Sequence, residues 1–98
     1  MKTYTGARTF DGVVVTVDGQ WLDARRDLHT YSLNSFEWGY EGAETLQLAL
    51  AIIADAVGDD AAREQCEPFM RAIVANFDNE WEITDEQVRG ALRDLAPS

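Results

Sequence analysis

The sequence is poor in the residues on which several common kinds of site depend. It contains one cysteine, Cys66, so it can form neither an internal disulfide nor a cysteine-based zinc cluster, which fits a reducing cytoplasm. Basic residues are also scarce, because 8 Lys and Arg stand against 18 Asp and Glu and give a formal net charge of −10. Nucleic acids and anionic membranes are bound through Lys and Arg. We therefore expect neither as a direct partner.

Long apolar runs are missing as well. Residues 1–10 have no stretch typical of a signal peptide, and the longest apolar run, Leu48–Ala54, is too short to span a bilayer. No complete catalytic motif is present. With 98 residues, of which 46% are hydrophobic, the chain predicts a single non-enzymatic domain over residues 1–98 that acts in the cytoplasm.

The first part of the chain predicts an antiparallel sheet. Lys2–Val17 is rich in Thr and Val and is divided by Asp11-Gly12, a strong hairpin signal. Asp18-Gly19 repeats that signal, so Gln20–Leu22 can form a short third strand. Trp81–Ile83 alternates apolar and polar residues and is expected to join the sheet edge. One face of such a sheet needs to be covered by helices.

Three helices are expected in the second part. The apolar residues of Glu44–Val57 occupy two faces, which predicts a deeply buried helix. A second helix is predicted from Ala61 to about Phe77, where Pro68 should kink or restart it, and a third from Asp85 to about Leu95. Together these elements predict an α+β fold, in which about three helices cover a small antiparallel sheet made of an N-terminal meander and one late strand.

Residues that cap helices precede two of these segments. Asp59 or Asp60 suits the N-cap of the second helix. Thr84 and Gln87 have the spacing of a capping box at the start of the third. The sequence therefore predicts side-chain caps at both starts.

Three motifs give the sequence a resemblance to a known family. They are Tyr4-Thr5-Gly6-Ala7-Arg8, the block Phe36-Glu37-Trp38-Gly39-Tyr40 and the helical stretch Gln47-Leu48-Ala49-Leu50-Ala51. In this order they resemble an uncharacterised prokaryotic domain family found in phages, plasmids, bacteria and archaea. The resemblance covers nearly the whole chain. It implies an α+β fold and a mobile-element neighbourhood, but neither a reaction nor a substrate.

Isolated residues that could carry chemistry have simpler structural explanations. His29 has serine and aspartate nearby, but no nucleophile motif accompanies it, so we interpret it as a hydrogen-bonded or exposed side chain. Cys66 lies on an apolar helix face, where a thiol acts as a small hydrophobe. Asp78, Glu80 and Glu82 alternate like the opening of a calcium loop, but isoleucine stands where the loop needs glycine. We expect no catalytic residue, cofactor or metal.

The aromatic block allows two interpretations. Phe36, Trp38 and Tyr40 could line a ligand pocket in which Glu37 orients a polar group. In the simpler interpretation, the rings fix the loop against the core beside the start of the first helix. Core packing is the preferred explanation.

The acidic residues are unevenly distributed, since residues 41–98 hold thirteen acids and four bases. Asp60, Glu64 and Glu67 have helical spacing, which places their carboxylates about 6 and 4.5 Å apart along the axis. These separations are comparable to the spacing of phosphates. A second acidic set contains no base and is expected to bind a basic partner together with the first. It consists of Asp78, Glu80, Glu82, Asp85 and Glu86.

An acidic surface of this kind could occupy the basic groove of a nucleic-acid-binding protein. We interpret the chain as a phage or mobile-element protein that binds and inhibits a basic nucleic-acid-handling host complex in the host cytoplasm, as a DNA mimic or anti-CRISPR-like inhibitor. The charge has a simpler explanation, a solvated face for solubility or high salt. The alternative function is a small-ligand-binding or housekeeping domain that uses the aromatic block. Exposed aromatic residues on the sheet could support a homodimer.

Overall fold

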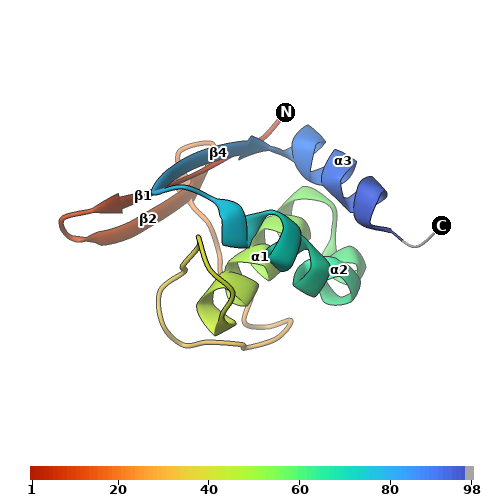
Figure 1. The fold of residues 1–98 in the computed structure, drawn as a ribbon, viewed down its shortest axis with the longest axis horizontal. Coiled ribbons are helices and arrows are strands. Elements are labelled where there is room, and N and C mark those ends of the chain that lie inside the picture. The colour runs from red at the N-terminus through yellow and green to blue at the C-terminus, as the bar shows by residue number, and fades with distance from the viewer. Residues whose placement is uncertain (97–98) are drawn as a thin grey trace.

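The computed structural model describes residues 1–96 and has an α+β fold (Figure 1). The strands are β1 (Thr3–Thr9), β2 (Gly12–Val17), β3 (Gln20–Trp21) and β4 (Glu80–Thr84). They form one antiparallel sheet in the order β3-β2-β1-β4. The helices are α1 (Ala43–Ala56), α2 (Asp59–Ala72) and α3 (Asp85–Leu95), with a 3₁₀ turn, η1 (Val74–Asn76), after α2. The predicted fold class is confirmed.

Two tight turns join the first three strands. Residues 10–11 form the first turn, one position earlier than predicted, because Gly12 already pairs with Thr9. At the second turn, Asp18 and Gly19 have φ angles of 50° and 83°. Two successive positive φ angles match the twist of a two-residue hairpin, which explains the Asp-Gly pair at this point.

Alternation along the strands gives the sheet an inner and an outer face. The inner face carries side chains that are at most 8% exposed, namely Tyr4, Val15, Trp81 and Ile83. The alternating positions define the outer face: Thr5, Ala7, Val14, Thr16, Trp21, Glu80 and Glu82. Helices α1 and α2 lie together on one side of the sheet, and the β1–β2 hairpin extends beyond them (Figure 1).

Helix α1 is the centre of the core. Seven consecutive residues, Leu48–Ala54, are at most 8% exposed. A helix is buried on all sides only when the face that usually points to solvent is apolar too. Here Leu48 and Ile52 occupy that second face, as the sequence indicated. The predicted deep burial of this helix is confirmed.

The helix starts differ from one another. At α3 the capping box is confirmed, since the Thr84 hydroxyl accepts the Gln87 N–H at 3.1 Å and the Gln87 side chain accepts the Thr84 N–H at 2.9 Å. At α2 the prediction of an aspartate cap is wrong. The N-cap residue is Gly58, and Asp59 and Asp60 stand in the first turn. There their charge still favours the positive end of the helix dipole.

The end of α2 also differs from the expectation. The helix passes Pro68 as one element and ends at Ala72, whereas the sequence predicted helix to about Phe77. Pro68 has no N–H to donate to the carbonyl of Glu64, four residues earlier. Both residues are exposed, so this carbonyl lies on the solvent side of the helix. The Asn76 side chain donates to the carbonyls of Arg71 and Ala72 at 3.3 and 3.0 Å, which closes the last turn.

The long connection between β3 and α1 has no helix or strand, and one buried side chain of α1 holds it. Gln47 is 1% exposed. Its Oε1 accepts the N–H groups of Tyr31 at 2.7 Å and Ser32 at 3.2 Å. Its Nε2 donates to the carbonyls of Ala24 at 2.7 Å and His29 at 3.0 Å. All four hydrogen-bonding positions of this amide are therefore occupied by the backbone of the connection.

Candidate functional site

Most basic side chains of this protein form salt bridges with its own carboxylates. Within residues 1–96, six of the eight basic residues have a carboxylate oxygen within 4.0 Å. Their acidic partners are Glu37, Glu41, Asp27, Asp55, Asp59, Asp60, Glu67 and Asp85. Eight of the eighteen carboxylates are thus compensated, and ten are left without a base in this part of the chain.

The predicted stripe on α2 is largely neutralised by its own helix. Asp60, Glu64 and Glu67 are all exposed, as expected. However, Asp60 lies 3.4 Å from Arg63, and Glu67 lies 2.6 Å from Arg71. Among the described residues only Glu64 of this stripe has no basic neighbour. The potential above the helix is therefore weaker than its sequence suggests.

The second acidic set keeps its charge. Asp78, Glu80, Glu82 and Glu86 are exposed, and within residues 1–96 no Lys or Arg nitrogen lies within 4.0 Å of any of them. Glu80 and Glu82 stand on the outer face of β4, two residues apart, which corresponds to about 6.7 Å along the strand. Asp78 precedes the strand, and Glu86 follows it in the first turn of α3. We call these four residues the β4 acidic patch.

Asp85 does not belong to this surface, although the sequence placed it there. Its residue exposure is 8%, and its carboxylate accepts the Glu86 N–H at 2.9 Å and the Arg89 guanidinium at 3.3 Å. Burial by itself raises the pKa of Asp85, but hydrogen bonds from the backbone of Lys2 and Glu86 and the charge of Arg89 outweigh it, so the pKa is lowered. Asp85 is a buried anion that stabilises the start of α3.

The aromatic block is divided between core and surface. Trp38 is completely buried, whereas Tyr40 is 47% exposed. The Trp38 ring stands edge-on to Trp81 at 5.7 Å, and the ring of Phe77 stacks on Trp81 at 4.4 Å. The preferred packing interpretation therefore holds for Trp38 and fails for Tyr40.

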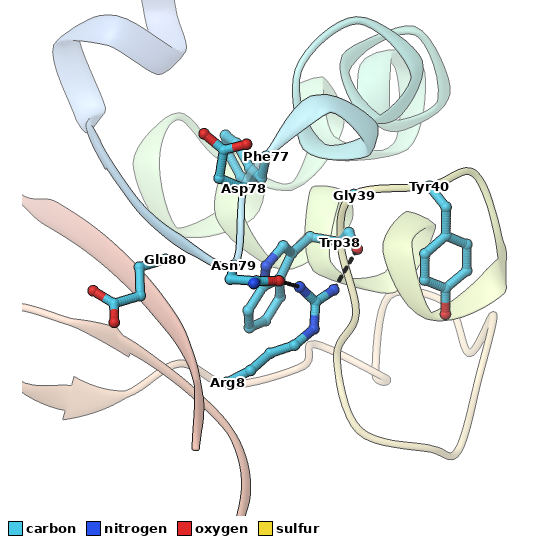
Figure 2. Close-up of a pocket in the computed structure, with 8 residues that line it drawn as sticks. All are labelled: Arg8, Trp38, Gly39, Tyr40, Phe77, Asp78, Asn79 and Glu80. Carbon is cyan, nitrogen blue, oxygen red and sulfur yellow. Dashed lines mark hydrogen bonds between the residues drawn. The ribbon is translucent and has the colours of Figure 1, made fainter. Parts of the chain in front are cut away.

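Arg8 fastens the loop of this block to the sheet. Its guanidinium lies 4.7 Å from the centre of the Trp38 ring and donates to the Trp38 carbonyl at 2.7 Å. It also donates to Asn79 at 2.7 Å and to Glu37 at 3.2 Å. Arg8 lines an open cavity of about 740 Å³, to which Tyr40 and Glu80 also contribute. Figure 2 shows Arg8 between Tyr40 on one side and Glu80 on the other.

The isolated candidates have structural roles. His29 is exposed, and its ring lies 4.1 Å from that of Tyr31. Cys66 is 3% exposed, and its sulfur lies 3.4 Å from the Tyr31 hydroxyl, a contact that helps to raise the pKa of Tyr31 to about 12. Within residues 1–96, no three His, Cys, Asp or Glu side chains are grouped so that they could hold a metal ion.

Tyr4 makes the stability of the fold sensitive to high pH. Its hydroxyl donates to Asp55 at 2.7 Å, and burial together with this carboxylate raises the pKa of Tyr4 far above its ordinary value of 10.0. The unfolded chain therefore loses this proton at lower pH than the folded chain, so deprotonation favours unfolding. We expect the free energy of unfolding to fall as the pH rises above 10.

Urea denaturation at pH 7 to 11 measures this effect. Tyr4→Phe should lose about 1.5 kcal/mol at pH 7, because a hydrogen bond to a charged group is removed. Above pH 10, the free energy of unfolding of Tyr4→Phe should fall less than that of the unaltered chain. A smaller fall should remain, because the pKa of Tyr31 is raised as well. Equal losses above pH 10 in both proteins would contradict this role of Tyr4.

These features define a small acidic α+β protein with an uncompensated carboxylate surface. A family model described as "Family of unknown function (DUF6166)" matches residues 4–94, so the chain belongs to this family. The expected membership of an uncharacterised domain family is thereby confirmed. No curated protein and no solved structure matches the chain. In residues 1–96, every helix is too short or too polar to cross a membrane.

The motifs behind the resemblance have packing roles in this fold. Tyr4 reaches Asp55 in α1, and Arg8 holds the aromatic block. Gly6 leaves room for the Trp81 ring, because a Cβ atom there would lie 2.3 Å from it. Sequence reasoning did not assign these roles, nor that of Gln47. The one available signal for Gln47 was an amide among apolar residues on a buried helix.

Proposed function

We propose that this protein is a non-enzymatic inhibitor, of phage or mobile-element type, that binds a basic nucleic-acid-handling protein of the host cytoplasm. The observation that supports this proposal is the β4 acidic patch, whose four exposed carboxylates have no base within 4.0 Å among residues 1–96. Exposed carboxylates repel one another, and a basic partner relieves this repulsion. A basic partner therefore gains more from this patch than from the neutralised stripe on α2.

The chemistry of the target follows from the arrangement of these charges. Glu80 and Glu82 lie about 6.7 Å apart on a strand, comparable to successive phosphates of a nucleic acid. Lys and Arg side chains that hold phosphates can pair with carboxylates in the same way. The protein then occupies a groove meant for DNA or RNA, as in a CRISPR effector, and excludes the nucleic acid.

Two triple charge reversals test the proposal. Glu80, Glu82 and Glu86 are replaced by Lys in one variant, and Asp60, Glu64 and Glu67 in its matched control, so both change the net charge by the same amount. The partner is isolated by pull-down from host lysate and identified by mass spectrometry, and its affinity is measured between about 50 and 300 mM salt. The first variant should weaken binding at least tenfold and the control clearly less.

The unaltered protein should also lose affinity as salt rises, and nucleic acid should compete with it. Circular dichroism checks that both variants keep the fold. The proposal is wrong if no nucleic-acid-handling partner is captured. It is equally wrong if the affinity for that partner does not respond to salt, or if the Glu80, Glu82 and Glu86 reversals weaken binding no more than the control.

A ligand-binding function is the second candidate, and the cavity around Arg8 is the observation that favours it. Its volume of about 740 Å³ lies within the usual range of ligand sites, and the half-exposed Tyr40 borders it. The rings of Trp38 and Phe77 pack against Trp81, and Arg8 already donates three hydrogen bonds to protein acceptors. If this candidate is right, a small metabolite should raise the melting temperature of the unaltered protein but not that of Tyr40→Ala.

A further inference from the structure

The outer face of the sheet carries an aromatic side chain that no packing role explains. Trp21 is 73% exposed, whereas the other two tryptophans, Trp38 and Trp81, are 0% and 8% exposed. Trp21 pairs with Thr16, Thr16 with Thr5, and Thr5 with the Glu82 of the β4 acidic patch. Side chains of residues paired in this way point to the same face.

The carboxylate end of this row borders a hollow. A depression of about 410 Å³ on the outer face is lined by Ala7, Val14, Glu80 and Glu82 together with neighbouring residues. Neither glutamate has a basic partner among residues 1–96. The face thus combines an exposed indole, a shallow apolar floor and two free carboxylates.

Charge decides what can cover this face. A second copy of the chain carries the same net charge of −10, so pairing two copies would bring like charges together. Nucleic acid is repelled for the same reason. A cationic peptide segment is attracted, and both ends of the row suit it, because an indole face attracts cations and carboxylates bind guanidinium groups in a bidentate manner.

We propose that the outer face of the sheet binds an arginine-rich segment of the basic partner, with one guanidinium on Trp21 and another between Glu80 and Glu82. This inference rests on the proposed function and names the surface and the chemistry through which it acts. Trp21 and Glu82 are three strand spacings apart, about 14 Å, which an extended segment spans in about four residues. Arginine is preferred over lysine because its planar guanidinium stacks on aromatic rings and matches carboxylate geometry.

Nona-arginine and nona-lysine peptides test this inference with the full chain at low salt. Calorimetry measures affinity, and acrylamide quenching of tryptophan fluorescence reports on Trp21, since the other two indoles are buried. Nona-arginine should shield Trp21 from the quencher and bind about tenfold more tightly than nona-lysine. Trp21→Ala should reduce that difference to the part that the carboxylates of Glu80 and Glu82 contribute, and it should abolish the shielding signal. Phe10→Ala, which removes another fully exposed aromatic ring from the hairpin tip, should change the affinity less than twofold.

Replacing both Glu80 and Glu82 by Gln should weaken binding of both peptides, and more than the matched change of Asp60 to Asn and Glu67 to Gln. If both peptides bind equally and only the Glu80 and Glu82 changes matter, the inference about Trp21 is overturned and the proposed function stands. If neither peptide binds in a salt-dependent way, the proposed function is overturned as well.

Discussion

Replacing Gln47 by alanine should lower the free energy of unfolding by about 3 kcal/mol or more. The amide makes four hydrogen bonds to backbone groups of the connection between β3 and α1, at 2.7 to 3.2 Å, and is 1% exposed. Each buried group left without a partner costs about 1–3 kcal/mol. Water can reach some of the four groups after the loop relaxes, which sets the expected loss nearer to the cost of one or two groups.

Urea denaturation followed by circular dichroism measures this loss. Gln65→Ala is the matched control, because Gln65 has the same amide on a neighbouring helix but a partly exposed position and an Oε1 atom without a hydrogen-bond donor among residues 1–96. Its loss should stay below about 1 kcal/mol. Limited proteolysis of Gln47→Ala should cut within residues 22–42 first. A loss as small as that of the control would show that the connection holds itself without this side chain.

Replacing Gly6 by alanine should be similarly destabilising, again by about 3 kcal/mol. A Cβ atom at this position would lie 2.3 Å from the Trp81 indole, closer than any packed atom can approach. Trp81 cannot simply move away, since it stacks on Phe77 and stands edge-on to the buried Trp38. The added methyl must therefore separate β1 from β4 or displace the aromatic cluster, and overpacking of this kind costs about 1–3 kcal/mol or more.

Tryptophan fluorescence and urea denaturation measure the effect of Gly6→Ala. Both the emission spectrum and the midpoint should change, because Trp81 and Trp38 move together. Gly90→Ala is the control. Gly90 lies inside α3, and a Cβ atom there would meet only the Arg93 side chain, at an ordinary distance of 3.7 Å. Alanine in a helix should leave stability unchanged or raise it by up to about 1 kcal/mol. Equal midpoints for the two variants would show that the close approach of Gly6 and Trp81 has no energetic weight.

Local and periodic features were the ones that could be predicted from the chain alone. Asp18-Gly19 predicts its turn because the turn requires positive φ angles at these two residues only. Thr84 and Gln87 cap α3 through contacts three residues apart. The burial of Leu48–Ala54 follows from an apolar pattern that leaves the helix no polar side. Both ends of α2 were misplaced, because Gly58 rather than an aspartate is its N-cap and the Asn76 side chain closes its last turn at Ala72.

The candidate site was predictable only in part. The sequence by itself determined the net charge, the two acidic segments and the exposure of Asp60, Glu64 and Glu67. It also determined the alternation that places Glu80 and Glu82 on one face of a strand. These properties depend on residue type and on spacing of a few residues.

Only the tertiary structure decided which carboxylates remain uncompensated. Lys2 pairs with Asp55, and Arg25 with Asp59, across 53 and 34 positions of the chain. The burial of Asp85 and the position of Trp21 in line with Glu82 likewise result from the pairing of strands that are distant in sequence. Electrostatic compensation depends on distance in space, because Coulomb energy falls with separation and salt screens exposed charges beyond about 8–10 Å. Spacing along the chain gives that distance only within a helix, a strand or a tight turn.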